Sequence, residues 1–175
     1  MSNIDTIAYG RAGQIFTASN VSAKIVTVVG TVMTGLIVYN PVGTNKYLAL
    51  MTAGFSMTTA LGSIMSLGVA ISPSQSVVPS STTAGSAVVK NANGGAAGSV
   101  ASVWDAATLG VACVTQRWFA GQDWITGGTG QFPYTYIDKI DGELGLMPGA
   151  AACFSMIGGT GPTGMGSISW VEVGL

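Results

Sequence analysis

Hydrophobic and polar residues alternate along much of this chain, and a period of two is the pattern of β-strands with one buried face. In the clearest stretch, Tyr47 to Thr58, one face carries Tyr47, Ala49, Met51, Ala53, Phe55 and Met57. The opposite face becomes polar halfway along, as expected where a strand leaves a core. A second alternating stretch, Met65 to Ile71, is predicted to pair with the first as a hairpin.

Turn residues divide the chain at intervals of roughly 8–12 residues, which is typical of a sandwich or barrel. Asn40 to Asn45 contains Pro41 and Gly43 and predicts a turn, and Asp141-Gly142 predicts a hairpin. Residues 102–109 are expected to make one helical turn. Further strands are predicted over residues 23–29, 34–40, 111–119, 134–140, 144–147, 150–157 and 166–173.

These elements predict an all-β fold, an antiparallel β-sandwich. Residues 1–20 are expected to form an N-terminal arm with one short strand near residues 14–18. Residues 21–175 are predicted to be a single sandwich domain with a long Ser/Thr/Gly-rich excursion over residues 72–100. Alternation alone leaves the strand order open, because a jelly roll and an immunoglobulin-like sandwich share it.

The chain has very few charges. Lys, Arg, Asp and Glu make up 7% of it, against about 25% in an ordinary soluble domain. Six basic residues and a net charge of −1 argue against nucleic acid as a partner. A hydrophobic content of 48% argues against disorder. Too few charges remain to coat a solvated surface, so we expect identical subunits to cover part of it.

The residue types present also limit the chemistry. The chain has no His, which removes Ser-His-Asp and Cys-His catalysis and every His-ligated metal site. No enzyme activity and no cofactor are therefore predicted. Cys113 and Cys153 are expected to be two small buried thiols, with a disulfide as the open alternative.

Neither secretion nor a membrane span is predicted. The N-terminus lacks a basic segment followed by an apolar run, so no secretory signal is expected. Residues 47–71 are long enough to cross a bilayer, but Ser, Thr and Gly interrupt them throughout. We therefore interpret this segment as strands.

Two clusters are candidate sites. Asp138, Asp141 and Glu143 surround one turn and are a weak candidate for a Ca²⁺ site, with a solvated acidic turn as the favoured alternative. A hydrolase that uses these carboxylates alone is disfavoured. An aromatic cluster is a candidate protein interface or sugar-stacking site, or a filler of the core: Trp118, Phe119, Trp124, Phe132, Tyr134 and Tyr136.

The C-terminal part carries a resemblance to a known class. It reads IDKIDGELGLMPGAAACFSMIGGTGPTGMGSISWVEV over residues 137–173, with GLIVYNPVGTNKYLALMTAGFSM earlier in the chain. Both stretches resemble head decoration or cement proteins of tailed phages, and sometimes head fibres. The resemblance implies a jelly roll that trimerises on the capsid lattice and binds the major capsid protein. It also implies assembly in the host cytoplasm, a final location in the virion, and no enzyme activity or cofactor.

The sequence therefore predicts a structural virion protein that decorates or cements a phage head as a homotrimer. In this interpretation residues 1–20 reach onto the capsid, with Arg11 as the arm's only basic residue. The alternative is a head- or tail-fibre or adhesin module that recognises host surface glycan through the aromatic cluster.

Overall fold

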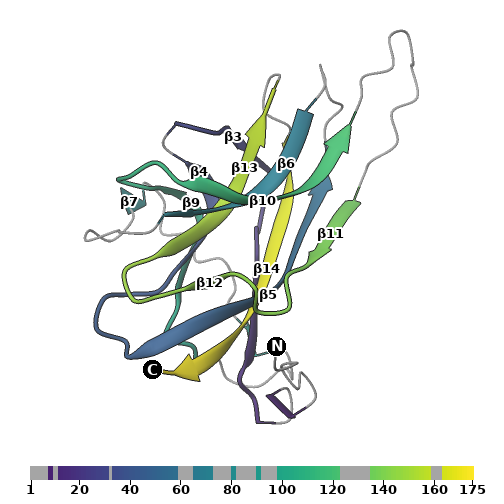
Figure 1. Cartoon of the computed structure of the whole chain (residues 1–175). Helices are drawn as coiled ribbons and strands as arrows, with labels where there is room; N and C mark the ends of the chain where they lie inside the picture. The colour runs from purple at the N-terminus through teal and green to yellow at the C-terminus, as the bar shows by residue number, and fades with distance from the viewer. Residues whose placement is uncertain are drawn as a thin grey trace, which may run out of the picture.

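Two β-sheets pack face to face in the computed structural model of the chain (Figure 1). The structure describes residues 8–9, 12–31, 33–58, 65–72, 80–81, 90–91, 98–122, 135–158 and 163–175. One sheet, sheet A, contains β1 (Ile15–Ser19), β2 (Lys24–Ile25), β5 (Lys46–Met57), β8 (Lys90–Asn91), β11 (Thr135–Lys139), β12 (Gly145–Leu146) and β14 (Thr163–Gly174). The other, sheet B, contains β3 (Thr27–Val28), β4 (Thr34–Tyr39), β6 (Met65–Ser72), β7 (Ser80–Ser81), β9 (Ser102–Thr108), β10 (Val114–Gln122) and β13 (Ala151–Ile157).

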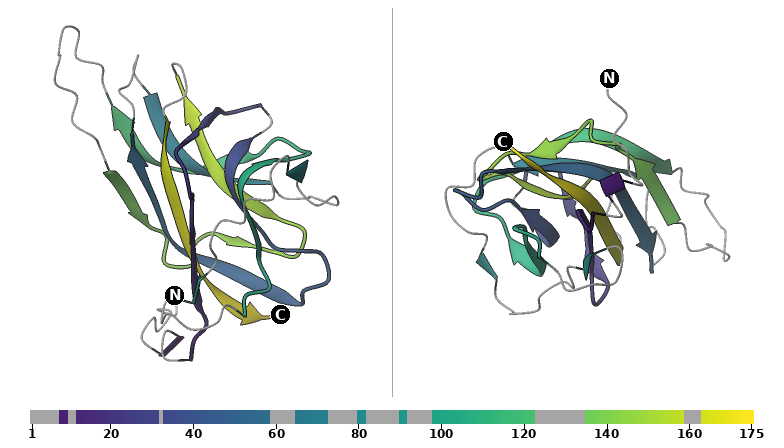
Figure 2. Two further views of the ribbon diagram at one scale, coloured as in Figure 1. Left: turned by 180° about the vertical axis from the view of Figure 1, so that it is seen from behind. Right: turned by 90° about the horizontal axis from the view of Figure 1, so that it is seen from below.

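The chain crosses repeatedly between the two sheets, as it does from β4 to β5 and from β5 to β6. Sheet A runs β11-β5-β14-β1-β8, and β12 and β2 pair with β5 and β14. Sheet B runs β10-β6-β13-β4-β9-β7, and β3 pairs with β13. Of these pairings only β13 with β3 is parallel. Figure 2 shows the two layers from two further directions. The predicted all-β antiparallel sandwich is confirmed.

The main core lies between the sheets, where inward-facing side chains of both alternate along their strands. Trp170 of β14 is fully buried and stacks on Phe16 of β1 with ring centroids 6.1 Å apart. The Phe55 ring of sheet A packs against the Phe154 ring of sheet B, with ring centroids 5.5 Å apart. Each such large apolar side chain contributes about 1.5–3 kcal/mol on burial, so these contacts hold the layers together.

A second apolar cluster covers the far face of sheet B. Ile37, Ala70 and Cys153 are all buried there, although their strand neighbours Val38, Val69 and Phe154 face the main core. Leu109 and Cys113, from the connection between β9 and β10, complete this cluster. Sheet B is therefore buried on both faces, which explains why its strands β4 and β13 read as nearly continuous apolar runs.

Both predicted hairpins, the one between residues 47–58 and 65–71 and the one at Asp141-Gly142, are wrong. In each case the two strands do not pair with each other. β5 lies in sheet A and β6 in sheet B. β11 and β12, on either side of Asp141-Gly142, do not pair with each other but both pair with β5. Positive φ angles at Asp141 and Gly142 form a tight turn there, and Gly142 N donates to the Leu50 carbonyl at 2.7 Å.

One further prediction needs correction. Residues 102–108 form β9 and not a helical turn. The short strand predicted near residues 14–18 is present as β1, which pairs with β14 along its whole length and buries Phe16 and Ala18. The excursion over residues 72–100 lies mostly outside the described residues, but β7 joins it to sheet B and β8 to sheet A.

The Asn40 to Asn45 turn is confirmed. The Asn40 side chain is buried, and its amide donates to the carbonyls of Lys46 and Leu146 at 2.8 and 2.9 Å. Among the described residues, no helix is both long enough and apolar enough to cross a membrane.

Candidate interaction surface

Arg117 joins the two sheets at one edge of the sandwich, where β10 of sheet B and β11 of sheet A lie. Register shifts on either side of Arg117 interrupt the pairing of β10 with β6, and such bulges re-aim side chains. Arg117 Nε lies 2.7 Å from Asp138 Oδ2, and Nη1 lies 2.5 Å from Glu143 Oε2. Its Nη2 also donates to the Lys139 carbonyl at 3.3 Å. Arg117, Asp138 and Glu143 are called the Arg117 clasp below.

This clasp accounts for most of the acidic turn that was a weak candidate for a metal site. Asp138 and Glu143 already face a guanidinium, which supplies the positive charge that a cation would bring. Asp141 is exposed. Within the part of the chain that the structure describes, no three acidic or Cys side chains are grouped so that they could hold a metal ion.

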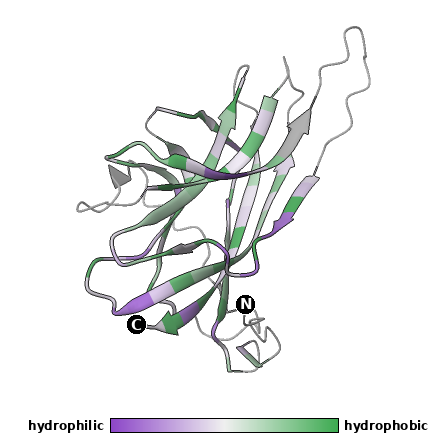
Figure 3. Cartoon of the chain, viewed as in Figure 1, coloured by the Kyte–Doolittle hydropathy of each residue, from purple (hydrophilic) through white to green (hydrophobic). Residues whose placement is uncertain are grey.

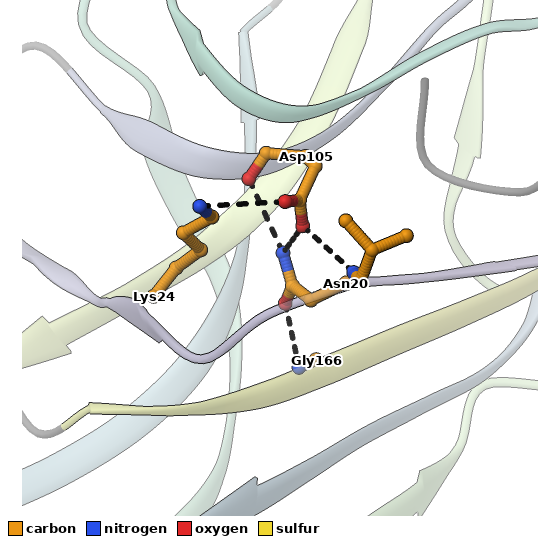
Figure 4. Close-up of polar contacts among 5 residues, drawn as sticks. Asn20, Lys24, Asp105 and Gly166 are labelled. Carbon is orange, nitrogen blue, oxygen red and sulfur yellow. Dashed lines mark hydrogen bonds and ion pairs between the residues drawn. The ribbon is translucent and has the colours of Figure 1, made fainter. Parts of the chain in front are cut away.

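A buried polar network joins the sheets at the opposite edge (Figure 4). Asp105 lies in a bulge of β9 and is buried, and Asn20 follows β1 and is buried as well. Asn20 Nδ2 donates to Asp105 Oδ1 at 2.7 Å, and Val21 N donates to the same oxygen at 3.0 Å. Gly166 N of β14 donates to Asn20 Oδ1 at 2.7 Å, while Lys24 Nζ lies 3.4 Å from Asp105 Oδ2.

Glu172 makes a third link of the same kind. It is buried near the end of β14, and its Oε1 accepts from Ser99 Oγ at 2.5 Å and from Val100 N at 2.8 Å. These bonds attach the segment that leads into β9 to sheet A. Buried charges are tolerated when they are hydrogen-bonded in this way.

The charged side chains therefore gather at the edges and leave the faces of the sandwich almost free of charge. Six of those described belong to the three links: Lys24, Asp105, Arg117, Asp138, Glu143 and Glu172. Figure 3 shows the same distribution, with strongly hydrophilic colour confined to short segments of the strands. The low charge of the sequence therefore corresponds to few charged side chains on the outer faces of sheets A and B.

The outer face of sheet A carries mainly small hydroxyl side chains. One row across β1, β14, β5 and β11 consists of Ser19, Ser167, Gly54 and Ile137. The next row consists of Thr17, Ser169, Thr52 and Lys139. A Cβ at Gly54 would lie 3.0 Å from Ser167 Oγ, so a larger residue here would require that hydroxyl to move. Ile137 projects from this face and is 72% exposed.

Several hydroxyls of this face are bonded to each other. Thr52 Oγ1 and Ser169 Oγ are 2.5 Å apart, and Ser169 Oγ also accepts from Thr52 N at 3.1 Å. Ser56 Oγ and Thr135 Oγ1 are 3.1 Å apart. A polar group that already has a partner costs little when it is covered, whereas an unpaired one costs about 1–3 kcal/mol. This face can therefore be buried by another protein at a small desolvation cost.

The predicted aromatic cluster is divided between surface and core. Trp118 is 44% exposed on the outer face of sheet B. Phe119 and Tyr136 are partly buried against the main core, and the Phe119 ring lies 6.3 Å from that of Phe154. Trp124, Phe132, Tyr134 and Arg11 lie outside the described residues.

The position of the Trp118 indole depends on the absence of a side chain at Gly68. It pairs with Gly68 of β6, and a Cβ at Gly68 would lie 3.0 Å from Trp118 Cε3 and 2.5 Å from the Arg117 carbonyl. The indole therefore lies close against the strand with one side open to solvent. Of the predicted aromatic residues that the structure describes, Trp118 alone is exposed enough to stack against a ligand.

Sequence reasoning missed the outer face of sheet A and the Asn20–Asp105 network. The outer face of sheet A could have been found in the sequence, because the alternate positions that face outward in residues 52–56 and 167–169 are all Ser, Thr or Gly. The network has no such signal, since its two side chains are 85 positions apart. No family model, curated protein or solved structure matches this chain.

Proposed function

We propose that the chain is a structural virion protein: a homotrimeric decoration or cement subunit that binds the major capsid protein of a tailed phage and stabilises the head. The observation that carries the proposal is the outer face of sheet A, which carries few charges, mainly small side chains and hydroxyls that are hydrogen-bonded to each other. Interfaces between subunits are depleted of charge at their centre and need close packing. A face of small side chains with few charges suits both requirements.

The strand order supports a jelly roll as the architecture behind this function. Eight strands pair as nested partners: β1 with β14, β4 with β13, β5 with β11 and β6 with β10. The first four of these strands alternate between the sheets, and so do the last four. A jelly roll consists of eight strands in two sheets with this kind of Greek-key winding, and viral capsid domains use it.

The proposal extends to location and partners. The chain assembles in the host cytoplasm, joins the capsid surface and leaves with the virion, without a cofactor or catalytic role. Because residues 15–19 are a strand of the sandwich, only the residues before β1 are available as a capsid-contacting arm. A deletion that tests the arm must therefore end before Gln14, since a longer one removes Phe16 from the core.

The experiment is mass spectrometry of purified particles from the phage that encodes the chain. We expect the chain in the particles at a copy number of the same order as the major capsid protein, and exposed on intact heads to surface labelling. Its absence from the particles, or a few copies confined to the tail, would contradict the decoration role.

The alternative, a fibre or adhesin module that binds host surface glycan, is favoured by one observation, the exposed indole of Trp118 on Gly68. Aromatic faces open to solvent suit stacking against sugars. Glycan-array binding that is lost in Trp118→Ala and retained in Ile137→Ala would favour this alternative. Binding unaffected by Trp118→Ala would remove its only structural support.

A further inference from the structure

Cys113 and Cys153 lie next to each other on the outer face of sheet B. Their Sγ atoms are 3.2 Å apart, closer than the usual separation of nonbonded carbon atoms, about 3.5–4.0 Å. Both side chains are buried free thiols. Cys153 belongs to β13 in the middle of sheet B, and Cys113 ends the connection between β9 and β10.

We propose that these two residues form a dithiol that a low-molecular-weight disulfide such as oxidised glutathione converts to an intramolecular disulfide. The bond would attach the β9–β10 connection to the central strand of sheet B. This inference is independent of the proposed function, because it concerns the second apolar cluster and not the outer face of sheet A.

The positions of the two thiols set the order of the steps. The residues before Cys113, Gly110 to Ala112, are exposed, so a local opening of this connection brings Cys113 to solvent. Cys153 is held in a central strand that is paired on both sides, and its thiol lies beneath this connection. The hydrogen bond to Cys113, burial and the Cys113 charge raise the pKa of the Cys153 thiol, which keeps it protonated at neutral pH.

The exchange then balances in two steps. The Cys113 thiolate attacks one sulfur of oxidised glutathione, a Cys113–glutathione disulfide forms, and one glutathione thiolate leaves. As the connection closes, Cys153 attacks the Cys113 sulfur, and the Cys153 proton passes to the second glutathione sulfur, which leaves as a thiol. Two protein thiols are oxidised and one glutathione disulfide is reduced to two thiols.

A cross-link between positions 40 residues apart restricts the unfolded chain. We expect oxidation to raise the Tm by roughly 10 °C for a chain of this size. The bond would form only where glutathione is oxidising, since the cytosol keeps such thiols reduced.

The test is incubation of the folded chain with oxidised glutathione, followed by intact mass and thiol counting after denaturation. We expect the loss of two hydrogen atoms and of both thiols in the monomeric chain, and a Tm increase that dithiothreitol reverses. Two persisting thiols, when the denatured chain is oxidised under the same conditions, would overturn the proposal. So would a disulfide that links two chains.

Two single variants test the order of attack. Cys153→Ala leaves Cys113 without a resolving partner and should retain one glutathione as a stable adduct. Cys113→Ala should be modified more slowly, because Cys153 is held in a central strand and is reached only when the connection opens. The absence of an adduct on Cys153→Ala, or equal adducts on both variants, would overturn the mechanism. Alanine is small and apolar, so both variants suit buried positions, and their folding is checked by their Tm without oxidant.

Discussion

The outer faces of the two sheets differ in whether the chain itself covers them. Sheet B is covered on its far side by a second apolar cluster that includes Ile37, Leu109 and Cys153. Sheet A presents hydroxyls, a glycine and the exposed Ile137 to solvent. Both faces carry few charges, with Lys139 on the outer face of sheet A, because most of the described charged residues belong to the links between the sheets. The difference teaches that low charge serves two purposes here: it buries one face within the chain and leaves the other ready to be buried by a partner.

The largest difference between the faces should appear when an isoleucine of each is shortened. Ile37→Ala removes a fully buried side chain from sheet B and should lower the free energy of unfolding by about 2–5 kcal/mol. In the dissociated chain, Ile137→Ala, on the outer face of sheet A, should change it by less than about 0.5 kcal/mol, because Ile137 is exposed there. Urea denaturation at a protein concentration low enough to dissociate the subunits measures both. Equal losses would mean that the faces do not differ as described.

The Asn20–Asp105 edge should show an intermediate effect. Asp105→Ala removes the carboxylate oxygen that accepts from Asn20 Nδ2 and Val21 N, and leaves Asn20 Nδ2 only the Asp105 carbonyl at 3.3 Å, which should cost about 1–3 kcal/mol. Ser167→Ala, an exposed polar residue of the outer face of sheet A, is the matched control and should cost less than about 0.5 kcal/mol. If Ser167→Ala lowers the free energy of unfolding as much as Asp105→Ala does, the polar groups of the outer face stabilise the fold as much as the buried network, which would contradict this prediction.

The Arg117 clasp should contribute least. Its guanidinium and Glu143 are partly exposed, and such ion pairs contribute about 0.2–1 kcal/mol. Arg117→Ala should lower stability by that amount at low salt, and the difference from the wild-type chain should shrink at high salt. Lys139→Ala, a nearby exposed cation, controls for net charge. A large loss that salt does not reduce would show that Arg117 acts through packing.

The strands themselves could be predicted from the sequence, but their partners could not. Alternation located β4, β5, β6, β11, β13 and β14 to within a few residues. It could not tell that β5 and β6 belong to different sheets, because the same alternation suits a hairpin and a crossover. β9 was missed since Asp105 interrupts its apolar pattern, and only the fold shows that Asn20 satisfies this carboxylate. β1 was placed in an arm because only Phe16 and Ala18 mark its buried side.

The candidate site was predicted in part for the same reason. The exposed Trp118 came from residue type alone, whereas the outer face of sheet A needs four strands brought side by side. Asp138 and Glu143 were a weak candidate for a metal site, and Arg117, which is distant in the sequence, pairs with both carboxylates instead. Partners of this kind are invisible to local patterns because they are joined only by the topology.

The most direct test of the account is the native mass of the chain and of two matched lysine variants, by light scattering or native mass spectrometry. Ile137→Lys puts a charge on the outer face of sheet A, and Val42→Lys puts one on the β4–β5 turn, where Val42 is 67% exposed. We expect the wild-type chain and Val42→Lys at three times the 17.6 kDa chain mass, and Ile137→Lys as a folded monomer. A monomeric wild-type chain, or a trimer that Ile137→Lys leaves intact, would contradict the account.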